Sequence, residues 1–168
     1  MDKSTFMKRK YQHTWKEGNA RELVVKKFLE RIGMVVEPYG FGALSDKYYP
    51  ESPSEPGIPD LKATYKGKII YFEVTGTRNI NIRPNDKLWI RPDKINYAKK
   101  HKDKVIYLAH VLDRYNYIRF IRLDRAEGEL IKKSIRQKDP KYNSIDTFVS
   151  ISPVNFMSVL DFEIVLND

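Results

Sequence analysis

The chain has 168 residues, enough for one domain with a sizeable core, and its 41% hydrophobic and 32% charged residues are an ordinary soluble balance. It contains no run of about 18 apolar residues and no signal-peptide pattern, so we expect one intracellular domain, cytoplasmic or nucleoid-associated, rather than a membrane or secreted protein. The lack of cysteine excludes disulfides and cysteine-ligated zinc, and the formal charge of +9 favours nucleic acid as partner.

The first structured element predicted is a helix that follows a basic tail at residues 1–16. Apolar residues repeat at helical spacing up to Gly33, which supplies a C-terminal stop. Glu22 lies on the same helix face as Val25 and Leu29, so we expect it to point into the interior. A buried carboxylate requires a partner or a metal ion. The alternative is a first-turn acid at the edge of the apolar stripe.

A proline-rich loop is predicted at residues 41–59, where four prolines stand among Ser, Glu and Gly. Connections of this length are often functional, so this one is a candidate lid or substrate-reading loop. It leads directly to the acidic strand that follows.

Two runs rich in Ile, Tyr, Phe, Val and Thr, residues 61–65 and 68–75, are joined by Lys66-Gly67. A two-residue X-Gly link between such runs predicts a β-hairpin. Strand alternation then separates an apolar face, directed to the core, from a polar face. The polar face carries Lys62, Tyr71, Glu73 and Thr75.

The hairpin register predicts that two acids face each other. If Tyr65 pairs with Lys68, counting outward places Asp60 directly opposite Glu73. Directly opposed Cβ atoms lie about 5 Å apart, so the two carboxylates can hold one divalent cation. A three-residue loop or a β-bulge would shift this register by one position. The alternative interpretation is an ordinary amphipathic hairpin with solvated charges.

The segment after the hairpin is strongly basic. Residues 78–104 contain nine Lys and Arg against three Asp, a local net charge of +6, interleaved with Trp89, Tyr97 and His101. Basic residues mixed with aromatics suit phosphate contact and base stacking, although charge runs are often only solvated surface. The candidate nucleic-acid-binding residues are Arg78, Arg83, Lys87, Arg91 and Lys94.

The remaining pattern predicts an α/β domain over residues 1–168, with a central mixed β-sheet flanked by helices. His110 lies in an apolar run and is expected to be a strand residue, not a ligand. We expect helices at 93–102 and 127–138, paired strands at 104–112 and 117–123, and short edge strands at 147–151 and 162–166.

An acid-bearing helix, Pro59-Asp60 on a strand and then Glu73-x-Thr75 on a hydrophobic strand together resemble the PD-(D/E)XK nuclease superfamily. Residues 1–110 are similar in particular to archaeal Holliday-junction resolvases. The resemblance implies a restriction-endonuclease-like fold, Asp60 and Glu73 as metal ligands, and Glu22 as an acid near the metal. With carboxylates and water as the remaining ligand types, Mg²⁺ or Mn²⁺ is the expected cofactor.

The chain departs from the family pattern at Thr75, where the resemblance calls for a lysine two residues after the Glu. That lysine orients or deprotonates the attacking water and offsets phosphate charge. Lys62 is the first choice as its substitute, with Lys87 and Lys94 as second choices. Thr75 either hydrogen-bonds the water or only fills strand space.

The sequence therefore predicts a metal-dependent nuclease acting on DNA, with RNA left open. A junction resolvase, acting as a symmetric homodimer, is the second enzymatic interpretation. A nucleic-acid-binding protein that does not cut is a third, favoured by the missing lysine. The last is a structural or partner-binding protein whose basic surface serves solubility or an acidic partner.

Overall fold

The computed structural model describes residues 19–40, 56–77, 81–136 and 139–168. Three predictions lie outside these ranges or largely outside them: the basic tail at residues 1–16, most of the loop at 41–59, and the role of Arg78.

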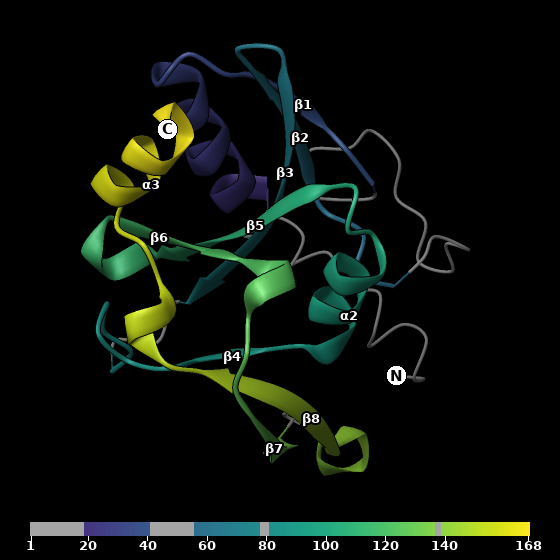
Figure 1. Ribbon diagram of the computed structural model, residues 1–168. Helices are drawn as coiled ribbons and strands as arrows, with labels where there is room; N and C mark the ends of the chain where they lie inside the picture. The colour runs from purple at the N-terminus through teal and green to yellow at the C-terminus, as the bar shows by residue number, and fades with distance from the viewer. Residues whose placement is uncertain (1–18, 41–55, 78–80, 137–138) are drawn as a thin grey trace.

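A five-stranded mixed sheet forms the centre of the molecule, with the strand order β1-β2-β3-β5-β6 (Figure 1). Strands β3 and β5 run parallel, and the other neighbours are antiparallel. This arrangement confirms the predicted mixed sheet flanked by helices. The strand bounds are β1 Val35–Pro38, β2 Leu61–Tyr65, β3 Lys68–Thr77, β5 Val105–Leu112 and β6 Tyr117–Arg122.

The hairpin of β2 and β3 has the predicted turn and register. Lys66 (φ 48°) and Gly67 (φ 78°) both adopt positive φ, as a two-residue type I′ turn requires. Tyr65 pairs with Lys68, and the ladder continues to the pair Leu61 and Phe72. Lys-Gly supplies this turn because glycine takes a positive φ without steric cost.

Two helices cover one face of the sheet (Figure 1). Residues 19–31 are helical, and Gly33 (φ 100°) follows their end as predicted. The second helix is α3, Val159–Asn167, which buries Phe162 against Phe120 of β6 with stacked rings 4.1 Å apart. The apolar face predicted for the hairpin also enters this core, through buried residues that include Leu61, Ala63 and Phe72.

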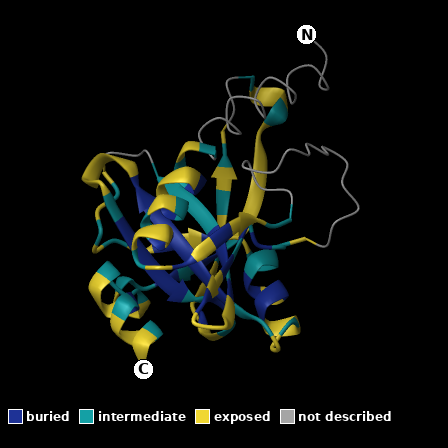
Figure 2. Cartoon of the chain, turned by 90° about the horizontal axis from the view of Figure 1, so that it is seen from above, coloured by how far each residue is buried: buried dark blue, intermediate teal, exposed yellow. Residues whose placement is uncertain are grey.

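The opposite face is covered by α2, Pro92–Lys100, and by a small antiparallel sheet of order β4-β8-β7. Its core joins Ile95 of α2 with Leu108 of β5 and Ile151 of β8. Figure 2 shows the buried central strands between outer elements that are largely exposed. The small sheet consists of β4 Leu88–Ile90, β7 Glu129–Ile135 and β8 Ser144–Ile151.

The helix predicted at 127–138 is wrong, because β7 occupies most of that segment. Ile131 and Ile135 lie in this strand, and β-branched residues favour strands. Every residue of β7 pairs with one of β8, and this long-range pairing decides the local structure. The strand predicted at 147–151 is confirmed within β8, which lies between β4 and β7 rather than at an edge.

The strand predicted at 162–166 is also wrong, since that segment belongs to α3. Ser158 caps this helix, and its side-chain oxygen accepts the N–H of Asp161 at 3.2 Å. The apolar run after the cap reads equally well as a short strand, and packing of Phe162 on the sheet favours the helix.

The strands predicted at 104–112 and 117–123 are confirmed as the β5–β6 pair. Short 3₁₀ turns complete the fold. In the described ranges, no helix is both long and apolar enough to cross a membrane. The 3₁₀ turns are η1 Asp113–Tyr115, η2 Leu123–Arg125, η3 Pro140–Tyr142 and η4 Pro153–Asn155.

Candidate active site

Asp60 lies immediately before β2, where two hydrogen bonds hold it beside Glu73. Its N–H donates to the Phe72 carbonyl at 3.0 Å, and its Oδ2 accepts the Val74 N–H at 2.8 Å. Because Phe72 and Val74 flank Glu73 on β3, the carboxylate of Asp60 is fixed next to that residue. The backbone bond goes to Phe72 rather than Glu73, so direct opposition of the acids is replaced by a one-residue offset of the kind a β-bulge produces.

The environment of Asp60 disfavours its charge. Burial raises the pKa of this carboxyl above its ordinary value, against the opposing effects of the Lys94 cation and of the Val74 N–H. A nearby cation therefore matters for keeping Asp60 ionised.

Lys94 supplies a positive charge to the acids from the first turn of α2. Its Nζ contacts Oε1 of Glu73, a residue that is only 3% exposed. Burial lowers the pKa of Lys94, whereas Asp60 and Glu22 both act to raise it. A helix N-terminus disfavours a cation, so the carboxylates rather than the helix stabilise the ammonium.

Glu22 reaches the same place from the helix at residues 19–31. It is 4% exposed, on the helix face that buries Val25 and Leu29, as its spacing predicted. Its negative charge acts to raise the pKa of Lys94, as that of Asp60 does. Glu22, Asp60 and Glu73 carry three negative charges when ionised against the one positive charge of Lys94, a net charge of −2.

The donor set fits a hard divalent cation in its chemistry. Within the described ranges, no group of three or more His, Asp or Glu side chains is arranged to hold a metal ion as it stands. The contact of Lys94 with Glu73 is a physical reason, because the ammonium takes a carboxylate oxygen that a metal would use. Carboxylate oxygens are nevertheless the ligands that Mg²⁺ and Mn²⁺ prefer, and a divalent cation matches the net charge of the cluster.

The three lysines considered as substitutes differ in their surroundings, and Lys87 is exposed. Lys62, the first choice, forms an ion pair with Glu37 of β1, its Nζ 3.4 Å from Oε1. Lys94, a second choice, contacts Glu73 instead. Thr75 stands two residues after Glu73 on the same face of β3 and is partly buried.

Three of the predicted nucleic-acid-binding residues lie on the surface. Arg83, Lys87 and Arg91 are exposed. Arg83 and Arg114 line a polar hollow of about 500 Å³ close to the end of β3. Exposed cations around a hollow suit contact with phosphates.

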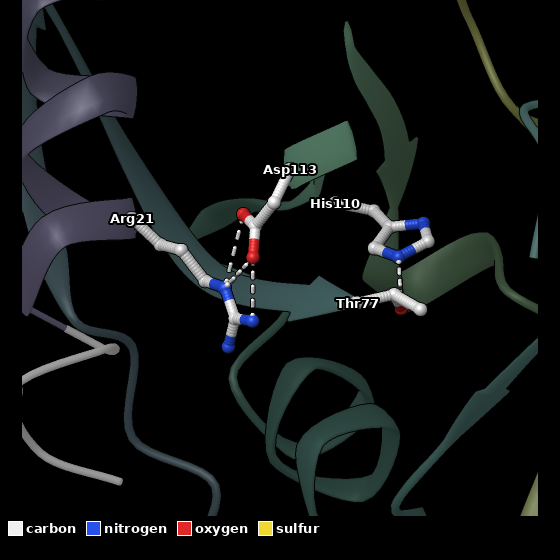
Figure 3. A network of polar contacts seen from close by, with 4 residues as sticks. All are labelled: Arg21, Thr77, His110 and Asp113. Carbon is white, nitrogen blue, oxygen red and sulfur yellow. Dashed lines mark hydrogen bonds and ion pairs between the residues drawn. The ribbon is translucent and has the colours of Figure 1, made fainter. Parts of the chain in front are cut away.

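Arg21 and Asp113 form an ion pair that the sequence did not point to (Figure 3). Nη2 of Arg21 lies 2.8 Å from Oδ2 of Asp113, and Nε also donates to this carboxylate. The guanidinium crosses β3 at Gly76, where an added Cβ would lie 1.9 Å from Nε of Arg21. A glycine inside a strand often marks such a close approach, which is the one signal that was present.

A second network missed from the sequence joins three buried or partly buried side chains. Nε2 of His110 lies 2.8 Å from Oγ1 of Thr77 (Figure 3), and Nδ1 accepts the Nε–H of Arg119 at 3.0 Å. These bonds favour a neutral ring, with its proton on Nε2. Burial and the cations of Arg119 and Arg21 lower the pKa of His110 to about 3.

Comparison with known proteins identifies the fold but no close sequence relative. No protein-family profile and no curated sequence matches this chain. The Holliday junction resolvase Hjc of Archaeoglobus fulgidus, an archaeal hyperthermophile, aligns with a TM-score of 0.52 and 16% identity, over 87% of this chain and 99% of Hjc. A nuclease from a fusselovirus aligns with a TM-score of 0.44 and 15% identity, over 87% of this chain and 88% of that one.

The likeness to Hjc confirms the predicted fold class. The central mixed sheet, with helices on both sides, matches the fold of that resolvase. At this level of identity the comparison concerns the fold, and the chemistry has to be argued from the site.

Proposed function

We propose that this protein is a metal-dependent nuclease that hydrolyses phosphodiester bonds, with DNA as its substrate. The observation that carries the proposal is the contact of the Lys94 ammonium with Glu73, next to the carboxylate of Asp60, with the charge of Glu22 also acting on that ammonium. Three acids around a single cation are costly to bury unless further positive charge arrives. A divalent metal ion provides that positive charge, and a phosphodiester bound next to it is the substrate.

Each acid has a distinct part in the proposal. Asp60 and Glu73 hold Mg²⁺ or Mn²⁺, and Glu22 supports the ion directly or through water. A divalent cation held there supplies an activated water and polarises the phosphate. The Val74 N–H keeps the Asp60 carboxylate in place for this task.

Lys94 takes the part of the lysine that Thr75 replaces. Its Nζ already lies at the carboxylate cluster, so it can orient the attacking water and offset charge on the phosphate. Lys62 would need to leave Glu37 to do the same. The hydroxyl of Thr75 is a second hydrogen-bonding group for the water on the same strand face.

A junction resolvase is the second candidate function, favoured by the alignment over 99% of Hjc. Symmetric cutting of two strands requires a homodimer. Sedimentation as a monomer, in the presence of four-way-junction DNA as well as without it, would argue against this candidate.

A protein that binds nucleic acid without cutting it is the non-enzymatic alternative. It is favoured by the threonine at the lysine position and by the ion pair of Lys94 with Glu73, which holds one acid oxygen already. Divalent metals would then alter nothing beyond binding.

The test is cleavage of labelled single-stranded, duplex and four-way-junction DNA in Mg²⁺ and in Mn²⁺. Asp60→Asn and Glu73→Gln should each abolish cleavage, because they remove a charged oxygen while conserving shape. Glu129→Gln, at an exposed acid at the start of β7, is the matched control and should cut normally. Absence of cleavage in both metals, with DNA binding retained, would contradict the nuclease proposal and favour the non-enzymatic alternative.

A further inference from the structure

A partly apolar pocket lies beside the acidic cluster, between the end of β3 and the segment that leads into β4. Its volume is about 650 Å³, within the range of about 300–1,000 Å³ typical of ligand sites. Thr75 and Thr77 line one side, and Ile82, Lys87 and Trp89 line the other. The pocket thus begins on the same strand that carries Glu73.

Hydrogen bonds from buried side chains hold the walls of this pocket in place. Arg119 is 1% exposed, and its Nη1 donates to the carbonyls of Pro84 at 2.7 Å and Asp86 at 2.8 Å. The same guanidinium bonds His110, which in turn bonds Thr77 on the opposite wall (Figure 3). One buried network therefore ties both walls together, so the pocket is preformed rather than created by a ligand.

Trp89 gives the pocket a flat aromatic surface at its rim. The residue is 48% exposed although it lies in a strand whose neighbours Leu88 and Ile90 are buried. Nζ of Lys133 stands 4.4 Å from the ring centroid, and Lys87 lines the pocket next to it. An exposed indole near two lysines matches a nucleotide, whose base stacks on aromatic rings and whose phosphate attracts lysine.

The distance between the pocket and the acids indicates which nucleotide of a bound strand the pocket would hold. Thr75 follows Glu73 by two residues on the same face, so the pocket edge lies about 7 Å along the strand from the acid. That separation is comparable to one nucleotide of extended backbone. A base in the pocket would then belong to a nucleotide next to the phosphate at the acids.

We propose that this pocket binds an unpaired nucleobase adjacent to the scissile phosphate, with Trp89 as the stacking platform. The inference rests on the proposed nuclease function and adds a substrate class to it: strands with an unpaired nucleotide beside the cut. A base within a perfect duplex is stacked and paired on both sides, so it enters only after the cost of unpairing has been met.

The experiment uses the fluorescence of Trp89 in the 168-residue chain, without divalent metal so that no cleavage occurs. The chain contains two tryptophans, and a Trp15→Phe variant leaves Trp89 as the only one. The probes are a short oligothymidylate and an abasic oligomer of equal length and charge. Stacking predicts quenching by the oligothymidylate and little by the abasic oligomer.

Binding affinities of two further variants separate stacking from charge. Trp89→Ala should weaken oligothymidylate binding on the order of tenfold and leave binding of the abasic oligomer unchanged. Trp89→Phe, which conserves an aromatic ring, should retain most of the affinity. Equal quenching by both oligomers, or unchanged affinity in Trp89→Ala, would overturn the base-binding role.

Failure of this inference is distinguishable from failure of the proposed function. If DNA cleavage persists but the oligomers do not quench the fluorescence of Trp89, the pocket assignment alone is overturned. Absence of binding to any nucleic acid contradicts both. Quenching by thymidine monophosphate as strong as that by the oligomer would make this a free-nucleotide site and overturn the strand-binding proposal.

Discussion

Lys94 offsets part of the negative charge of the candidate site. It contacts Glu73, and the charges of Asp60 and Glu22 also act on its ammonium, so its removal takes a cation away from these acids. Breaking a buried pair from one side costs about 3–5 kcal/mol because the remaining charge is uncompensated.

Lys94→Ala should therefore lower the free energy of unfolding by on the order of 3 kcal/mol in EDTA. Mg²⁺ should restore part of this loss, because it replaces the missing charge, and should stabilise the variant more than the wild type. Thermal unfolding with and without Mg²⁺ measures both effects. Lys99→Ala, an exposed lysine on the same helix, is the control. A metal effect of equal size in all three proteins would contradict the role given to Lys94.

His110 makes the stability of the protein depend on pH. The folded protein keeps the ring neutral, with its pKa lowered to about 3 from 6.5, whereas the unfolded chain takes up a proton near pH 6.5. The stability contribution is complete above pH 6.5 and is lost as the pH falls from 6.5 toward 3. The loss is on the order of 4 kcal/mol over this window.

His110→Gln should flatten the pH dependence between 6.5 and 3 relative to wild type, because glutamine does not titrate. Urea unfolding over that pH range gives the two curves, and their difference isolates this histidine from the other titrating groups. Parallel curves for the two proteins would mean that His110 is not held neutral by the fold.

Gly76 is required for the path of Arg21 across β3. An added Cβ would meet Nε of Arg21 at 1.9 Å, so Gly76→Ala should push the side chain away from Asp113. We expect a loss of about 1–2 kcal/mol. In an Arg21→Ala background, the same change should cost nothing or stabilise, since the obstacle is gone and alanine suits a strand better than glycine. Urea denaturation of the four proteins tests this, and additive effects would contradict it.

At the scale of elements, the parts of the fold that local signals specify are the parts that could be predicted. The β2–β3 hairpin has its turn and register encoded in Lys66-Gly67 and the alternation around them, whereas Asp60 departs from that register by one residue. Glu22 could be placed because a single helix face determines its direction.

The elements that could not be predicted depend on distant partners. β7 is a strand because it pairs with β8, and the segment at 162–166 is helical because Phe162 packs on the central sheet. Local spacing carried no information about either partner. The contact of Lys94 with Glu73 depends on a distant partner as well, since only the packing of α2 next to β3 distinguishes Lys94 from Lys62 and Lys87.

The α3 helix offers a test at this scale. Ser158 caps its first turn by accepting the Asp161 N–H, and the helix places Phe162 in the core. Ser158→Ala should cost about 1 kcal/mol of stability by leaving that N–H unsatisfied. Chemical denaturation checks this, with Ser144→Ala, at an exposed position at the start of β8, as control. Equal stability of the two variants would contradict the cap.

For the whole molecule, the candidate site joins elements from both sides of the sheet. Glu22 comes from the helix that covers one face, Asp60 and Glu73 from the sheet itself, and Lys94 from α2 on the other face. The site therefore exists only when both layers are folded against the sheet, and an ion bound there stabilises the complete domain.

The most direct test of this account is the stoichiometry of Mn²⁺ binding, measured by electron paramagnetic resonance on the wild type, Asp60→Asn and Glu73→Gln. We expect one tightly bound ion per wild-type chain and its loss in both variants, with Glu129→Gln binding like the wild type. A wild type that binds no Mn²⁺, or variants that bind it as the wild type does, would contradict the claim that these acids form a metal site.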